Sequence, residues 1–130
     1  MKGVKFKMNE VITFGEMLQI KRKSRGLSLR EVSHSCGITP AYYCDIERGA
    51  RNPPQPQLLE KIIDVLYFSK EERRELIRLA YLERKQISTE LVEYMCLEAP
   101  CALRLIELAK ELNLSNNYFE KLINVLEKDM

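Results

Sequence analysis

The sequence lacks the features of several functional classes. No run of apolar residues approaches the length that a helix needs to cross a bilayer, and the opening Met-Lys-Gly-Val-Lys-Phe-Lys lacks the apolar core of a signal peptide. There is no glycine-rich phosphate loop, and the single histidine, His34, falls on the outer side of a short predicted helix. We therefore expect a cytoplasmic protein that is not an enzyme and does not bind membranes.

The four cysteines do not have the spacing of a metal site. They stand at positions 36, 44, 96 and 101, with no Cys-x-x-Cys pair among them. Reduced thiols are the expected state in the cytosol, and we predict no metal ion or other cofactor. The acidic pairs Glu71 with Glu72 and Glu107 with Glu111 have the spacing of helix surfaces, so we interpret them as solvated and not as catalytic.

Charge is unevenly distributed along the 130 residues, although the net charge is only +2. Residues 1 to 80 carry fifteen Lys or Arg against ten Asp or Glu, whereas residues 81 to 130 carry six against nine. A basic part followed by an acidic part fits a nucleic-acid-binding module joined to a segment with another role.

Residues 26 to 54 contain the most informative pattern. Ser28 and Glu31 have the spacing of a capping box, which predicts a helix that begins at Leu29. Gly37 can adopt the positive φ that a sharp turn after this helix needs. The inward stripe of the helix consists of small or apolar residues: Leu29, Val32, Ser33 and Cys36.

A second short helix is predicted directly after this turn. Thr39 and Pro40 are typical of an N-cap and a first helical residue, and Gly49 is expected to end the helix. By 3.6-residue periodicity, the inward side carries Tyr43, Ile46 and Glu47. The outward side carries Ala41, Asp45 and Arg48, with Tyr42 at the edge.

The inward acid Glu47 needs a partner. In the preceding helix, predicted at about residues 13 to 25, Phe14, Leu18 and Arg22 follow one another at four-residue steps on the inward stripe. A buried carboxylate and a half-buried guanidinium are each costly alone. The sequence therefore predicts a structural ion pair between Arg22 and Glu47.

These residues resemble the lambda-repressor-like helix-turn-helix regulators, also called the Xre or Cro/cI group. The similarity lies in Gly-Leu-Ser before the first short helix, a small residue at Ser33, the Gly-Ile-Thr turn, and the closing motif Ile46-Glu47-Arg48-Gly49-Ala50-Arg51-Asn52-Pro53. It covers roughly residues 13 to 80. It implies an all-α fold, in which a five-helix lambda-repressor-like DNA-binding domain precedes a small C-terminal helical extension.

On this basis the chain divides into three parts. They are an N-terminal arm at 1–12, a helix-turn-helix DNA-binding domain at 13–84, and a C-terminal helical region at 85–130. The domain is completed by helices predicted at about residues 57 to 66 and 70 to 84, the latter behind a Ser-x-x-Glu capping box.

The C-terminal region is predicted to contain helices with broad apolar faces. One helix is expected after Ser88 or Thr89, a second from Pro100 to about residue 112, and a third from about residue 116 to 127 with Ser115 as its cap. About fifty residues cannot hide that much apolar surface alone. It either packs on the DNA-binding domain or belongs to a dimer or partner interface.

The resemblance implies that the helix at 40–48 enters the major groove of DNA. Outward residues are then expected to face the bases: Pro40, Ala41, Tyr42 and Asp45. Contacts to the DNA backbone are expected from Lys23, Arg25, Arg30, Thr39, Arg48, Arg51 and Asn52, where the resemblance alone implies the roles of Arg51 and Asn52. Pro40 and Ala41 offer the bases little chemistry, and Leu29 replaces a Gln common in the family, so backbone contacts are expected to supply much of the affinity.

Two functions remain open from the sequence. The leading hypothesis is a sequence-specific repressor that binds double-stranded DNA as a homodimer, with two half-sites about one helical turn apart. The alternative is an antitoxin-like or scaffold-like helix-turn-helix protein whose acidic, apolar C-terminal helices bind a partner protein. The operator, any effector, the choice between activation and repression, and the partner are not specified by the sequence.

Overall fold

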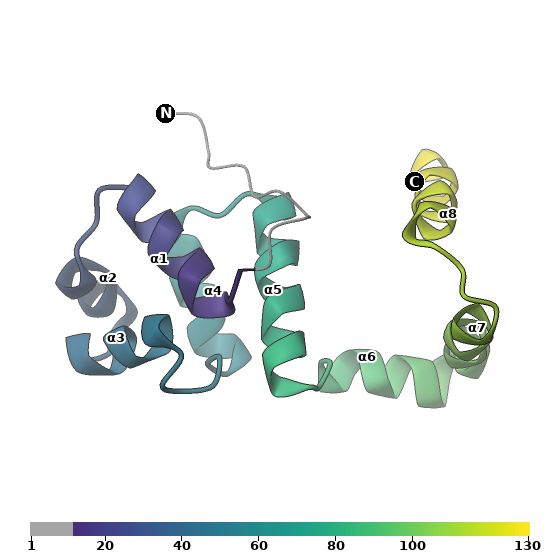
Figure 1. Ribbon diagram of the computed structural model, residues 1–130, viewed down its shortest axis with the longest axis horizontal. Helices are drawn as coiled ribbons and strands as arrows, with labels where there is room; N and C mark the ends of the chain where they lie inside the picture. The colour runs from purple at the N-terminus through teal and green to yellow at the C-terminus, as the bar shows by residue number, and fades with distance from the viewer. Residues whose placement is uncertain (1–11) are drawn as a thin grey trace. The chain divides into compact units, whose positions relative to one another are not determined.

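The structure is a computed structural model that describes residues 12–130, and the chain forms two compact units (Figure 1). The first unit is Met1–Gln86 and the second is Ile87–Met130. All regular secondary structure in the described residues is helical, which confirms the predicted all-α fold. The predicted N-terminal arm, apart from its last residue, lies outside the described part of the chain.

Capping residues define the helices of the first unit. Thr13, Ser28 and Ser69 each form a complete capping box with the glutamate three residues later. Gly37 and Gly49 end their helices with φ angles of 72° and 77°. The helices are α1 (Phe14–Ser24), α2 (Leu29–Cys36), α3 (Pro40–Arg48), α4 (Pro56–Leu66) and α5 (Lys70–Arg84).

These helices surround a single hydrophobic core. α1 contacts α3 and α5, while α2 contacts α3 and α4 (Figure 1). The apolar inward residues predicted for the first three helices are part of this core, apart from Leu29, which is half-buried at its edge. Arg22, Ser33 and Glu47, also predicted to point inward, are buried polar side chains. Its fully buried side chains include Phe14, Met17, Leu18, Val32, Tyr43, Ile46, Ile62, Leu66 and Leu76.

α1 approaches the end of α3 so closely that a glycine is needed at the contact. A Cβ atom added to Gly15 would lie 2.1 Å from the backbone oxygen of Glu47, far inside van der Waals contact. No sequence pattern pointed to this glycine, because the requirement arises only from the distance between two helices.

The predicted ion pair lies at the same contact between α1 and α3. Arg22 donates two hydrogen bonds to Glu47, with Nε–Oε1 at 2.7 Å and Nη2–Oε2 at 3.1 Å. Its third nitrogen, Nη1, donates to the carbonyl of Leu27 at 2.9 Å. The side chains are 10% and 4% exposed, and the hydrogen bonds to Glu47 raise the pKa of Arg22. Bidentate pairing and the added carbonyl bond offset the cost of burying both charges.

A second, largely buried ion pair joins α1 to α5. Lys21 Nζ lies 2.7 Å from Glu72 Oε1, and the two side chains are 1% and 11% exposed. The interpretation of Glu72 as a solvated surface acid is therefore wrong. Burial alone raises the pKa of Glu72, but hydrogen bonds from Lys21 and Ser69 outweigh this effect and lower the pKa below its ordinary value. The ammonium also lies 5.5 Å from the centre of the Phe68 ring.

The second unit is helical throughout its regular structure. Its elements are α6 (Thr89–Glu93), the π-helix η1 (Tyr94–Glu98), α7 (Pro100–Glu111) and α8 (Asn116–Lys128). The first predicted helix therefore continues as a π-turn, in which the Ala99 N–H donates to the Tyr94 carbonyl at 2.7 Å. Ser115 occupies the predicted cap position of α8, but its side chain makes no capping hydrogen bond.

The second unit builds almost no core of its own. Among residues 87–130, all of which are described, only Ala109 is buried. Large apolar side chains stay exposed on every element, including Leu91, Leu97, Leu105, Ile106, Leu112, Tyr118, Ile123, Val125 and Leu126. No helix in the described residues is both long and apolar enough to span a membrane.

The buried pair at the contact of α1 and α3 generates a stability prediction. Replacing Glu47 with Ala leaves Arg22 buried without its counter-charge, so the free energy of unfolding should fall by about 3 kcal/mol or more. Chemical denaturation measures this loss. Glu75→Ala serves as the control, because it removes an exposed pair with Arg78 and should cost less than about 1 kcal/mol. A loss below about 0.5 kcal/mol for Glu47→Ala would contradict a buried pair.

Candidate nucleic-acid interface

α3 has one face in the core and the other in solvent. Tyr43, Ile46 and Glu47 are buried, as their spacing predicted. Of the four residues predicted to face bases, Pro40 and Ala41 are exposed, whereas Tyr42 and Asp45 are half-buried on the flank of the helix.

The beginning of α3 is a capped helix N-terminus that lies in solvent. The hydroxyl of Thr39 accepts a hydrogen bond from the Tyr42 N–H at 3.1 Å, and Pro40 occupies the first turn. The partial positive charge of a helix N-terminus favours an anion such as a phosphate group. Thr39 and Pro40 are both exposed, so this end of the helix is open to a ligand.

Four side chains on and after α3 form one polar group, which we call the α3 cluster: Tyr42, Asp45, Arg48 and Arg51. Arg48 Nη2 lies 2.5 Å from Asp45 Oδ1, and Arg51 Nε lies 3.8 Å from Asp45 Oδ2. The guanidinium carbon of Arg51 lies 4.8 Å from the centre of the Tyr42 ring. The hydrogen bond to Asp45 raises the pKa of Arg48. All four residues were predicted to contact DNA, but their pairing was not, although the three-residue step from Asp45 to Arg48 is a signal for it.

The loop after α3 is held against α5. Pro53 and Pro54 are buried, and the Arg84 guanidinium donates a hydrogen bond to the Pro53 carbonyl. Asn52 stays exposed at the rim of a polar hollow of about 390 Å³ that is also lined by Tyr42, Gln55, Glu83 and Arg84. The prolines thus fix the backbone from which Arg51 and Asn52 project.

The remaining predicted phosphate contacts lie on other elements. Lys23 and Arg30 are exposed on α1 and α2. Arg25, however, donates to the carbonyls of Leu66 and Tyr67 at 3.1 and 2.8 Å, where it stabilises the end of α4. The sequence indicated Arg25 as a helix-end cation or a phosphate contact, and it gave no signal of these bonds to the end of α4.

The described residues provide no obvious metal centre. They contain no group of three or more His, Cys, Asp or Glu side chains that could hold a metal ion. The four cysteines are free, and burial raises the pKa of the Cys36 thiol. The exposed α3 surface carries guanidinium and hydroxyl groups together with the carboxylate of Asp45, whose side chain is 31% exposed.

Comparison with known proteins finds relatives of the first unit. Residues 13–76 match a family described as a helix-turn-helix domain. The HTH-type transcriptional regulators SinR of Bacillus subtilis (strain 168) and of Bacillus licheniformis are each 36% identical over 52 residues, which is 40% of this chain and 47% of each relative. The chain thus matches about half the length of these relatives.

One solved structure aligns with most of this chain. It is described as a SinR protein/SinI protein complex, with 22% sequence identity and a TM-score of 0.45 over 90% of this chain and 97% of that chain. The family match itself extends from the N-cap of α1 into α5, so it includes the whole α3 surface.

Proposed function

We propose that the chain is a sequence-specific DNA-binding transcriptional regulator of the lambda-repressor-like type, because residues 13–76 match a helix-turn-helix domain and the sequence resembles that family. The observation that carries this proposal is the exposed face of α3, which combines an open helix N-terminus with the cationic side chains of Arg48 and Arg51. In the proposed complex α3 lies in the major groove.

The dimensions and side chains of α3 suit such a groove. The major groove is about 12 Å wide, and a helix with its side chains is about 10–12 Å across. Pro40 and Ala41, at the exposed beginning of α3, are small enough to let the helix approach base edges closely. Tyr42 and Asp45 then supply the polar groups that face the bases.

Backbone contacts supply much of the affinity in this proposal. Arg48, Arg51 and Asn52 project beside the groove-facing surface, and Thr39 marks the helix N-terminus that faces a phosphate. Lys23 and Arg30 extend the cationic surface, and Arg25 stays a predicted contact in spite of its bonds to α4. Binding that depends on phosphates must weaken steeply as salt rises.

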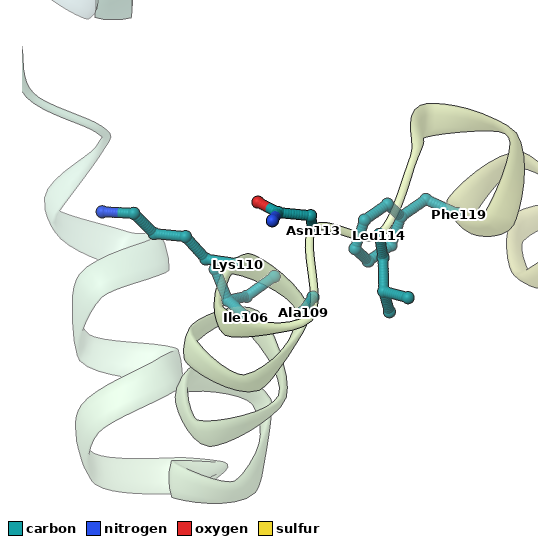
Figure 2. A pocket seen from close by; sticks show the side chains of 6 residues that line it. All are labelled: Ile106, Ala109, Lys110, Asn113, Leu114 and Phe119. Atoms are coloured by element: carbon teal, nitrogen blue, oxygen red, sulfur yellow. The ribbon is translucent and has the colours of Figure 1, made fainter.

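A homodimer joined through the second unit completes the proposal. This unit buries only Ala109, and a hollow of about 480 Å³ lies between α7 and the start of α8. Figure 2 shows the side chains that line it. Apolar side chains from both helices line the hollow, with Ile106 on α7 and Phe119 on α8. A second copy that covers these faces would bring two α3 helices to one DNA site, and such a dimer represses by occluding a promoter.

A partner protein at the same surface is the second candidate. Residues 87–130 carry eight Asp or Glu against four Lys or Arg, so acidic groups border the exposed apolar faces. This charge favours a basic partner with its own apolar face and weighs against a tight homodimer. The two candidates predict different oligomeric states for the purified chain.

The DNA-binding proposal is tested with a fluorescent random-sequence duplex titrated at several salt concentrations. We expect salt-sensitive binding, and Arg51→Gln should weaken it and reduce the slope of log K against log salt by about 1. Arg78→Gln is the matched control, since Arg78 is an equally exposed arginine on α5 that pairs with Glu75. Salt-insensitive or absent binding would refute the proposal, as would an equal effect of the two variants.

The dimer is tested by analytical ultracentrifugation. The wild-type chain should be dimeric at micromolar concentration, and Ile123→Asp should shift it to monomer because Ile123 is 51% exposed on the apolar side of α8. Asn117→Asp adds the same charge at an exposed polar position of α8 and should leave the dimer intact. A wild-type monomer over this range would reject the homodimer and favour the partner protein.

A further inference from the structure

Two arginines hold the carboxylate of Asp45. A residue that only faces the bases would not need such ion pairs. One oxygen accepts from Arg48 at 2.5 Å, and the other faces Arg51 at 3.8 Å. Arg51 also contacts Tyr42, with its guanidinium carbon 4.8 Å from the centre of the ring. Asp45 is thus fixed from two sides, although its own side chain is still 31% exposed.

This arrangement fixes the orientation of the Asp45 carboxylate and leaves some of its lone pairs free to accept further hydrogen bonds. A carboxylate has about four lone-pair sites, and the two arginines occupy at most two of them. The arginine side chains are 67% and 56% exposed, so they stay in contact with solvent and with any approaching phosphate. The cluster therefore presents two cations and one anion on the same surface.

The anion has opposite effects on different base pairs. In the major groove, cytosine N4 and adenine N6 present amino donors, whereas guanine O6 and N7 and thymine O4 present acceptors. A carboxylate accepts a hydrogen bond from an amino donor, but it repels an acceptor and the surrounding phosphates. A protein that discriminates by repelling unsuitable base pairs therefore binds most DNA sequences less tightly.

We propose that Asp45 is a specificity-determining residue whose carboxylate, positioned by Arg48 and Arg51, disfavours binding to DNA in general and gains a further hydrogen bond only where a base amino group faces it. The proposal rests on the DNA-binding function proposed above. Asp45 also reduces the net positive charge that the two arginines offer to phosphates. Its removal therefore strengthens non-specific binding and weakens selectivity at the same time.

The test compares Asp45→Asn with the wild-type chain on two duplexes. One has random sequence, and the other is the duplex that the wild-type chain enriches from a random pool. Asp45→Asn should bind the random duplex about two- to fivefold more tightly, because an exposed like-charge repulsion is lost. The ratio of affinities for the enriched and random duplexes should fall about tenfold.

Asp64→Asn is the matched control. Asp64 is an exposed acid on α4 that forms no ion pair among residues 12–130, so its removal changes the net charge by the same amount at another place. It should leave the affinity ratio unchanged. A general loss of folding would weaken binding to both duplexes, which is the opposite of the expected gain on random DNA.

The possible results separate this inference from the function on which it rests. If the wild-type chain binds no duplex, the DNA-binding function itself fails. If the wild-type chain binds, the inference is overturned when Asp45→Asn keeps the wild-type affinity ratio, when it weakens binding to random DNA, or when Asp64→Asn changes the ratio equally.

Discussion

The contact between α1 and the end of α3 is the constraint on which the rest of the first unit depends. Arg22 grips Glu47 with two hydrogen bonds, and Gly15 lets the two helix backbones approach within a distance that no side chain would allow. Together they fix the rotation of α3 about its own axis. With Tyr43, Ile46 and Glu47 turned inward, the opposite side of the helix must face solvent.

The two units differ in how much of their apolar surface they bury. The first packs α1 to α5 around a closed core and adds two ion pairs that hold α1 to its neighbours. The second leaves its apolar side chains exposed on short helices, so its stability depends on what covers them. In the proposed dimer, a second copy covers these side chains, so the two α3 helices are brought to one DNA site only when the chains associate.

Local signals in the sequence were sufficient for the helix-turn-helix. Capping boxes at Ser28 and Ser69 placed the starts of two helices, because a cap acts within one turn of the chain. The pair of Arg22 and Glu47 was also predictable, since an acid on an inward stripe requires a nearby cation. Periodicity also gave the buried side of α3 correctly.

Features that depend on distances between helices were not predictable in this way. Lys21 and Glu72 are 51 residues apart, and a lysine in the last turn of a helix is already explained by the helix dipole. Arg25 was similarly ambiguous until its bonds to the end of α4 were known. Within the α3 cluster, the three-residue spacing of Asp45 and Arg48 indicated one ion pair. Helical spacing does not predict the contacts of Arg51, because Arg51 lies after the end of α3.

The central claim, that the outward side of α3 is the surface that contacts DNA, is tested most directly by nuclear magnetic resonance. The ¹⁵N-labelled full chain is titrated with a short duplex enriched from a random pool, and backbone amide shifts are followed. The account predicts the largest changes between Thr39 and Asn52, with little change in α5. Changes concentrated in α5 or in α7 and α8, with α3 unaffected, would contradict it.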